Sequence, residues 1–213
     1  MAKVKLAQLH ELGEQIKRGQ IPAWKARAVF GLSEKETETP LDMYLALTKA
    51  AKAELMTAEQ LQALLEGKDE VLGIYKVTVD YNLTLEQMIA AGKYDWATDE
   101  RFPVLGKGKV ERELVLVHLN KVASTDEVLA EIDRRGLKSA EIEDLLVLGA
   151  VKPELQRRFS IMELGSSWGC SRNGLHYFAF IDHDNFGRVL RLLYCGNGWG
   201  EERRFLAVRK DAA

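Results

Sequence analysis

Apolar residues in the first seventy positions recur at intervals of three and four residues, which is the spacing of one face of a helix. One such stripe covers residues 6–16, and Gly19 follows it as a stop signal. Similar stripes begin near Pro22, Pro40 and Thr57. The pattern predicts a helical N-terminal region whose apolar faces form a core or an interface between helices.

The pattern becomes strand-like after residue 71. Ile74–Tyr81 alternates between apolar and polar positions, and Glu113–Leu119 is an apolar run typical of a buried strand. Three further β-prone runs lie near the C-terminus, separated by loops rich in Gly, Asn, Asp and Ser: Leu175–Ile181, Val189–Cys195 and Phe205–Val208. These runs predict a small antiparallel sheet with long loops.

Several helix starts carry a capping box, in which two side chains satisfy free backbone amides of the first turn. The boxes are Thr57–Gln60, Thr84–Gln87 and Ser124–Glu127. Ser139 is predicted to cap a further helix, which ends at Gly149. Together the patterns predict an α+β protein with a helical region over residues 1–70 and an α+β domain over residues 71–213.

Charge and cysteine content narrow the classes of partner. The chain has 30 basic and 32 acidic side chains and a formal net charge of −2, so nothing favours nucleic acid or an anionic membrane. No run has the length of a membrane span, and the N-terminus lacks the apolar run of a signal peptide, so a cytoplasmic location is expected, with export by a route that leaves no sequence signal as the alternative. Cys170 and Cys195 are expected to be reduced thiols, with a disulfide or redox role as the alternative.

Two short stretches carry a family resemblance that covers roughly residues 74–210. Gly136-Leu-Lys-Ser-Ala-Glu-Ile-Glu-Asp144 and Phe205-Leu-Ala-Val-Arg209 are similar to the helix start and the last strand of C-type-lectin-like domains, in the branch of formylglycine-generating enzymes and retroelement-diversified receptors. The resemblance implies paired first and last strands, two flanking helices and long loops that present a binding surface. The end of the chain also resembles bacterial proteins that finish in a similar Phe-Leu-Ala-Val-Arg-Lys, which implies no activity.

The sequence departs from this family at the positions that carry its chemistry. The helix start lacks the family's Pro and Trp, with Asp144 near the Trp position, and the calcium-dependent sugar-binding motifs are absent. Copper chemistry of the formylglycine type needs a close cysteine pair, and Cys170 and Cys195 stand in no matching motif. The resemblance therefore implies the fold, and no cofactor, calcium or sugar is expected.

Asp182-His183-Asp184 is the tripeptide most suggestive of chemistry. Asp and Asn are common in loops between strands, so an exposed loop is predicted here; the alternative is a transition-metal site with His176 and Cys170 as further ligands. His118 lies in an apolar strand, where a hydrogen-bonded sheet residue is a more frequent role than a catalytic base. No nucleophile elbow or phosphate loop is present, so no catalytic residue is assigned.

The C-terminal loops hold the side chains that best suit recognition. Trp and Arg give large contact areas, and Asn adapts its hydrogen bonds to a partner. The predicted binding residues are Arg172, Asn173, Asp182, His183, Asn185, Asn197 and Trp199. For Trp199 a place in the core beneath the loops is an equal alternative, and for Trp168 the core is preferred.

These patterns predict a non-catalytic module that binds a protein, or another macromolecule, through its C-terminal loops. One alternative is an enzyme that uses a metal or a cysteine, with His176, Asp182 and His183 among its residues. The other is a structural protein that oligomerises through its N-terminal helices.

Overall fold

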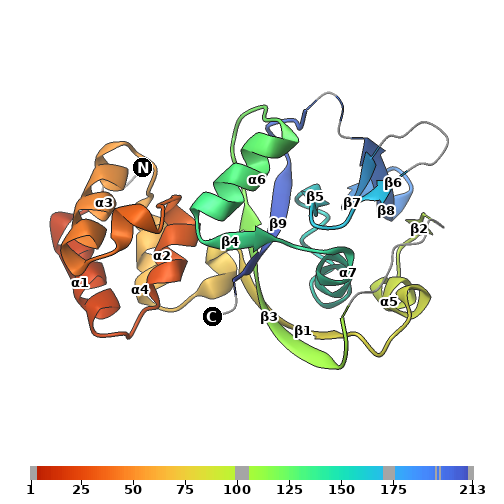
Figure 1. Ribbon diagram of the computed structural model, residues 1–213, viewed down its shortest axis with the longest axis horizontal. Coiled ribbons are helices and arrows are strands. Elements are labelled where there is room, and N and C mark those ends of the chain that lie inside the picture. The colour runs from red at the N-terminus through yellow and green to blue at the C-terminus, as the bar shows by residue number, and fades with distance from the viewer. Residues whose placement is uncertain (1–3, 99–105, 170–175, 195, 197, 211–213) are drawn as a thin grey trace. The chain divides into compact units, whose positions relative to one another are not determined.

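A computed structural model describes residues 4–98, 106–169, 176–194, 196 and 198–210. It contains both helices and a mixed β-sheet, which confirms the predicted α+β class. Internal contacts divide the chain into two compact units (Figure 1). The first unit comprises Met1–Tyr75 and Asp133–Leu137, and the second comprises Lys76–Ile132 and Lys138–Ala213.

The first unit is helical. Its elements are α1 (Leu6–Lys17), α2 (Ala23–Phe30), α3 (Pro40–Lys52) and α4 (Ala58–Leu65), with short 3-10 helices η1 (Lys35–Thr37) and η2 (Asp69–Leu72). The predicted apolar stripes supply its core, in which fully buried leucines come from three helices: Leu12, Leu47, Leu61 and Leu64. Lys25 of α2 forms an ion pair with Asp69 of η2, with Nζ 2.6 Å from Oδ1.

Residues 133–137 also belong to the first unit, although they are far from its other residues in the sequence. Arg135 Nη1 donates a hydrogen bond to the carbonyl of Ala28 (2.9 Å), and Arg134 Nη2 donates to the carbonyl of Gly31 (2.6 Å). Gly31 ends α2 in the left-handed conformation. The two guanidinium groups therefore satisfy carbonyls at the C-terminal end of α2, where the helix itself provides no partners.

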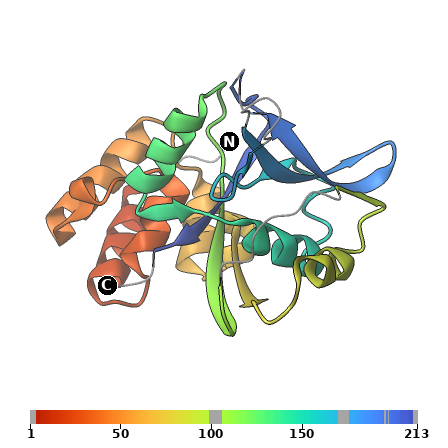
Figure 2. The same ribbon diagram turned by 45° about the vertical axis from the view of Figure 1, so that its right-hand side comes forward.

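A mixed sheet forms the framework of the second unit, with strands ordered β1-β3-β9-β5-β7-β8-β2 and with β4 and β6 paired to β9 and β7 (Figures 1 and 2). The strands are β1 (Ile74–Asp80), β2 (Trp96–Ala97), β3 (Lys109–Val117), β4 (Leu137–Ser139), β5 (Ile161–Met162), β6 (Trp168–Gly169), β7 (His176–Asp184), β8 (Gly187–Tyr194) and β9 (Arg204–Arg209). The helices are α5 (Leu85–Gly92), α6 (Thr125–Arg134) and α7 (Ile142–Val151).

Two strand pairs dominate this sheet. β3 runs antiparallel to β9, with Leu114 opposite Val208, and β7 forms a long antiparallel hairpin with β8. The predicted small antiparallel sheet is part of a larger mixed sheet, because β5 runs parallel to β9 and β2 runs parallel to β8. Both β5 and β2 have two residues, too few for a periodic pattern in the sequence.

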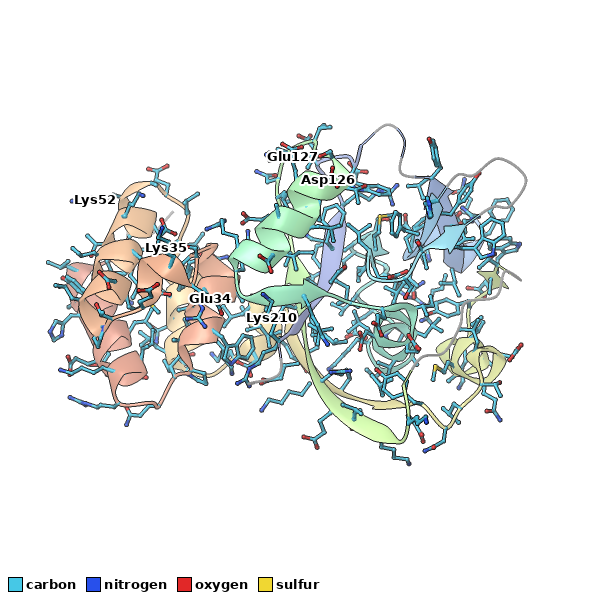
Figure 3. All side chains as sticks on the ribbon, in the orientation of Figure 1. Glu34, Lys35, Lys52, Asp126, Glu127 and Lys210 are labelled. Atoms are coloured by element: carbon cyan, nitrogen blue, oxygen red, sulfur yellow. The ribbon has the colours of Figure 1, made fainter. Side chains whose placement is uncertain are left out.

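The three predicted capping boxes are confirmed. Thr84 Oγ1 accepts from the amide of Gln87 (3.3 Å) while Gln87 Oε1 accepts from the amide of Thr84 (2.8 Å), and the other two boxes have the same reciprocal bonds. At the start of α6, Asp126 and Glu127 occupy the first turn, where the helix dipole favours negative charge (Figure 3). The helix after α6, in contrast, does not begin where Ser139 predicted.

Ser139 ends strand β4, and α7 begins at Ile142 with Glu141 as its N-cap. The Ser139 hydroxyl instead accepts a hydrogen bond from the amide of Leu164 (3.2 Å). The carboxylate of Asp144 reaches back to the amide of Glu141 (3.0 Å) and closes a capping box there. A serine that suits a helix cap thus bonds to a neighbouring segment, a tertiary contact that local sequence does not encode.

Arg188 of β8 holds the hairpin against the ends of two helices. Its Nη1 donates to the carbonyl of Gly92 at the end of α5 (2.7 Å), and its Nη2 donates to the carbonyl of Gly149 in α7 (2.6 Å) and to Gln156 Oε1 (3.0 Å). The guanidinium also lies 5.3 Å from the ring centre of Tyr94. These bonds offset the cost of burying the cation and fix the turn end of the β7–β8 hairpin.

Among the residues that the structure describes, no helix is both long enough and apolar enough to cross a membrane.

Candidate functional site

The β7–β8 hairpin ends in a tight turn at Asn185-Phe186. Asp184 Oδ1 accepts the amide of Phe186 (2.8 Å), an Asx turn that fixes the loop. Gly187 has a φ of 93°, and a Cβ there would overlap the carboxylate of Asp95. Asp95 comes this close because its Oδ2 accepts the amide of Arg188 (2.8 Å). Both the turn and its support are therefore fixed by hydrogen bonds.

Four side chains meet beside this turn, and we call them the hairpin-tip cluster: Trp96, Asp184, Phe186 and Arg191. The Arg191 guanidinium lies 5.3 Å from the ring centre of Trp96 and 5.9 Å from that of Phe186. Its Nη1 is 2.6 Å from Asp184 Oδ2. Phe186 is 73% exposed and Trp96 is 48% exposed, so the cluster presents two aromatic rings and a guanidinium to solvent.

A second set of aromatic side chains, the aromatic row, crosses three strands: Trp168, Tyr177 and Tyr194. The rings of Trp168 and Tyr177 lie 5.6 Å apart, and those of Tyr177 and Tyr194 lie 5.8 Å apart. Tyr194 is three positions from Arg191 on β8, so the row lies on the opposite face of the hairpin from the cluster. Residues 170–175 connect β6 to β7, and Cys195 follows β8, so the row adjoins both predicted recognition loops in the chain.

Three of the predicted binding residues lie on this hairpin. Asp182 and His183 belong to β7, and Asn185 is exposed in the turn. The prediction that Asp182-His183-Asp184 forms a loop is wrong, because the strand continues to Asp184 and the turn follows it. Asp182 is partly covered, and its backbone carbonyl accepts a hydrogen bond from Gln156 Nε2 (2.8 Å). His183 is exposed on the strand.

Trp199 lies in the core. Its ring is 1% exposed and packs edge-on against Phe178 and Phe205, with ring centres 6.1 and 6.4 Å away. Its Nε1 donates to Thr125 Oγ1 (3.1 Å). A ring this deeply buried makes no surface contact, so we assign Trp199 to the core alternative and remove it from the binding surface. Trp168, for which the core was preferred, is only half-buried.

Other predicted residues lie outside the described part of the chain: Cys170, Arg172, Asn173, Cys195 and Asn197. Their roles stay predictions. Within the described ranges, no group of three or more His, Cys, Asp and Glu side chains is placed to hold a metal ion. Asp184, one of the suggested ligands, forms the ion pair with Arg191.

His118 follows β3 rather than lying within it. Its Nε2 is 2.7 Å from the carbonyl oxygen of Glu201, an acceptor, so Nε2 donates this hydrogen bond. Burial lowers the pKa of His118, and the bond to Glu201 opposes that shift. The geometry agrees with a hydrogen-bonded residue that links the end of β3 to the segment before β9.

Sequence reasoning missed a group of buried carboxyl groups: Glu143, Asp144 and Glu163. Glu163 is 0% exposed, and its burial raises its pKa to about 8. Burial likewise raises the pKa of Asp144 to about 6, although Arg112 Nε lies 3.9 Å from its Oδ1. Such shifts are frequent at functional sites, but these groups are enclosed and accessible to no ligand. The sequence signal that could have indicated a buried carboxyl group is the glutamate at position 163, between the apolar residues Met162 and Leu164.

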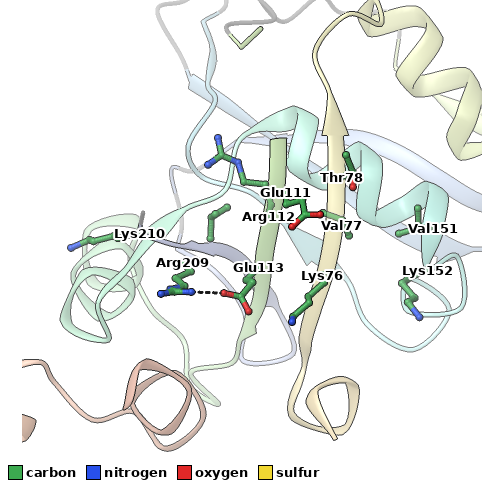
Figure 4. A pocket seen from close by; sticks show the side chains of 11 residues that line it. Lys76, Val77, Thr78, Glu111, Arg112, Glu113, Val151, Lys152, Arg209 and Lys210 are labelled. Atoms are coloured by element: carbon green, nitrogen blue, oxygen red, sulfur yellow. Dashed lines mark hydrogen bonds and ion pairs between the residues drawn. The ribbon is translucent and has the colours of Figure 1, made fainter. Parts of the chain in front are cut away.

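The second unit also contains a pocket of about 790 Å³ (Figure 4). It borders β1, which is at the opposite end of the strand order from β8 and β2. β1, β3, β9 and the C-terminal end of α7 supply its walls. The lining residues are Lys76, Val77, Thr78, Glu111, Arg112, Glu113, Val151, Lys152, Val208, Arg209 and Lys210. Sequence reasoning missed this pocket as well, since its residues come from four separate elements.

In comparisons with known proteins, no family model, curated protein or solved structure matches this chain.

Proposed function

We propose that the second unit is a non-catalytic binding module that recognises a protein through the tip of the β7–β8 hairpin. The observation that carries the proposal is the hairpin-tip cluster, in which exposed Trp96 and Phe186 flank Arg191. Exposing a large aromatic side chain to water costs free energy. At protein interfaces, aromatic residues and Arg are enriched among the residues that contribute most of the binding energy.

The cluster is held in place before any partner arrives. Asp184 orients Arg191, and Asp95 fixes the turn through the amide of Arg188. Side chains that are already ordered lose less conformational entropy on binding, so more of the contact energy remains as affinity. The aromatic row lies on the opposite face of the hairpin and is not part of this surface.

Charge favours a protein over a nucleic acid as the partner. Arg191, the cation of the cluster, is paired with Asp184, and the whole chain has a formal net charge of −2. Nucleic-acid binding relies on several unneutralised cations that displace counterions from phosphates. A nearly neutral aromatic surface matches the composition of protein interfaces more closely.

We also propose a C-type-lectin-like architecture for the second unit. Its support is the antiparallel pairing of β3 with the final strand β9, with α6 and α7 between them in the chain. β1, which precedes β3, and the parallel strand β5 are additions to the expected layout. In this arrangement the loops between the paired strands carry recognition, as the hairpin tip does here.

A photo-crosslinking amino acid at position 186, introduced in the source cells, tests the binding function. We expect one protein to be crosslinked from position 186, and the same crosslink to disappear when Trp96 and Arg191 are both changed to Ala. The matched control is Val122, another exposed apolar residue of the second unit. Equal products from positions 122 and 186, or no product at 186, would contradict recognition through the hairpin tip.

Self-association of the first unit is a second candidate function. Leu41 and Leu45, one turn apart on α3, are 66% and 55% exposed. Adjacent leucines on a helix surface suit contact with another helix. Analytical ultracentrifugation tests this candidate: an oligomer that Leu41→Glu with Leu45→Glu converts to monomer supports it, and a monomeric wild type excludes it.

A further inference from the structure

The aromatic row brings three side chains to one face of three neighbouring strands. β6 pairs with β7 and β7 with β8 (Figure 1), and the register places Trp168 opposite Tyr177 and Tyr177 opposite Tyr194. Residues directly opposite each other on adjacent strands project to the same face of the sheet. The ring-centre distances of 5.6 and 5.8 Å agree with this register, so the three rings form one surface.

Each member of the row has a polar atom that is available to a ligand. Tyr194 is 41% exposed, and Trp168 and Tyr177 are partly exposed. Within the described ranges, no hydrogen bond joins the indole Nε1 of Trp168, or the hydroxyl group of Tyr177 or Tyr194, to another residue. None of these three atoms is buried. The row therefore presents three hydrogen-bond donors beside apolar ring surface.

The row carries no formal charge. Its polar atoms are one indole N–H and two phenol groups. His176, the neighbour of Tyr177 on β7, projects to the opposite face because side chains alternate along a strand. A charged ligand would lose hydration here without gaining an ion pair. The surface therefore matches an uncharged ligand that has hydrogen-bond acceptors and apolar groups.

A proline-rich segment in the polyproline II conformation has this chemistry. Proline has no backbone N–H, so the segment presents carbonyl acceptors without matching donors. The backbone of this helix makes no internal hydrogen bonds, which leaves those carbonyls available. Surfaces lined by aromatic side chains recognise such segments in several kinds of binding domain. One turn rises about 9 Å over three residues, which is comparable with the length of the row.

From these features we infer that the aromatic row binds a proline-rich segment of a partner protein in the polyproline II conformation. Its pyrrolidine rings pack against the aromatic rings, and its carbonyls accept hydrogen bonds from Trp168 Nε1 and the two tyrosine hydroxyl groups. The row lies on the opposite face of the β7–β8 hairpin from the hairpin-tip cluster. The inference is therefore independent of recognition at the hairpin tip.

NMR titration of the isotope-labelled full chain tests the inference, with a capped oligoproline peptide of about nine residues, or three helical turns, as the probe. We expect a saturable shift of the indole N–H resonance of Trp168, with a Kd below about 1 mM. Loss of this resonance in Trp168→Phe assigns it. Trp96, in the hairpin-tip cluster, and Trp199, in the core, are internal controls whose indole resonances should not shift.

Two variants separate the polar and the apolar contributions. Tyr194→Phe keeps the ring and removes the hydroxyl group, so the affinity should fall about two- to tenfold. Trp168→Ala removes a ring and should weaken binding about tenfold or more; this variant is followed by the backbone amide shifts of β8. The matched control is Tyr44→Phe on α3 of the first unit, which should leave the Kd unchanged. An unaltered Trp199 resonance shows that each variant remains folded.

A flexible Gly-Ser peptide of the same length lacks the preformed helix and should not bind measurably. The inference is overturned by absence of a saturable Trp168 shift at 10 mM oligoproline (about ten times the expected Kd), by equal binding of the Gly-Ser peptide, or by wild-type affinity in both Tyr194→Phe and Trp168→Ala. A shift of Trp96 alone would place the peptide at the hairpin tip instead. A Trp168 shift on dilution of the protein without peptide would assign the row to a second copy of the chain, which also overturns the inference.

Discussion

Glu163 is a fully buried carboxyl group. Its Oε2 accepts the amide of Ser166 (2.7 Å), while burial and the nearby negative charge of Glu143 disfavour its ionised form. The pKa therefore rises from an ordinary 4.5 to about 8. In the folded protein the group stays protonated over a pH range in which the unfolded chain has already lost the proton.

The free energy of unfolding should therefore depend on Glu163 between pH 4.5 and 8. The raised pKa contributes stability that is complete below pH 4.5 and is lost as pH rises through 8, at on the order of 1.4 kcal/mol per pH unit. Glu163→Gln carries no titrating proton, so we expect it to be more stable than the wild type at pH 9. Denaturant unfolding of both proteins from pH 5 to 9.5 measures the difference, and parallel pH profiles would refute it.

Gly187 is required by both its backbone conformation and its close neighbour. Its φ of 93° disfavours any Cβ, and Asp95 occupies the space that a Cβ would take. Gly187→Ala should lower the free energy of unfolding by about 2–4 kcal/mol, because it adds a steric overlap to the backbone strain. Gly108→Ala is the matched control, since Gly108 has a similar positive φ with open space around it.

Gly108→Ala should cost only about 1 kcal/mol, from backbone strain alone. Chemical denaturation of the two variants measures the difference. Equal losses would show that Asp95 moves freely and does not support the hairpin turn.

At the scale of elements, the capping boxes define where helices begin. In α5 the box joins Thr84 and Gln87 through two hydrogen bonds. Thr84→Ala removes one acceptor and should destabilise the protein by about 1 kcal/mol, with faster amide hydrogen exchange in the first turn of α5. Thr84→Ser keeps the hydroxyl and should retain the wild-type exchange rates. Equal exchange in the two variants would argue against the cap.

Helix starts and long strands were predictable because their signals lie in residues close together in the sequence. A capping box needs only residues three positions apart, and the strands β1, β3, β7, β8 and β9 have apolar runs long enough to be recognised. β2 forms by pairing with the longer strand β8, and β5 forms by pairing with both β7 and β9, a condition that depends on tertiary structure. Ser139 has a good capping side chain and bonds instead to Leu164, for the same reason.

The candidate site was less predictable than the fold. Asn185 lies in the turn between β7 and β8, as polar residues between two strand patterns indicate, but none of the predicted binding residues belongs to the hairpin-tip cluster. The partner of Arg191, Trp96, is nearly a hundred positions away in the chain, and only the parallel pairing of β2 with β8 brings the two together. Aromatic residue type alone did not distinguish Trp199, which is buried, from Trp96, which is exposed.

At the scale of the whole molecule, residues 133–137 make the chain of the first unit discontinuous. Changing Arg134 and Arg135 together to Ala removes the hydrogen bonds to the carbonyls of Gly31 and Ala28. We expect a loss of about 2–4 kcal/mol in the stability of the first unit, because hydrogen bonds from charged groups contribute about 1.5–3 kcal/mol each and do not add fully.

Amide hydrogen exchange measures this effect by region. Exchange should increase at the C-terminal end of α2, while amides of the β7–β8 hairpin stay protected. As a control, changing the exposed residues Lys17 and Arg18 of the first unit to Ala should leave exchange in α2 unchanged. Unaltered exchange in α2 of the Arg134/Arg135 variant would show that the two arginines do not stabilise the helix end.

The discontinuity also sets an order of events during protein synthesis. The ribosome synthesises Met1–Tyr75 before Asp133–Leu137, which follows about sixty residues later. At ordinary translation rates, the carbonyls of Ala28 and Gly31 therefore lack their hydrogen bonds from Arg135 and Arg134 for roughly 3–12 s. By then all of β3 and α6 has been synthesised, while β7, β8 and β9 have not. The first unit is therefore completed by a segment that lies within the sequence of the second unit, before the strands that complete the sheet of the second unit have been synthesised.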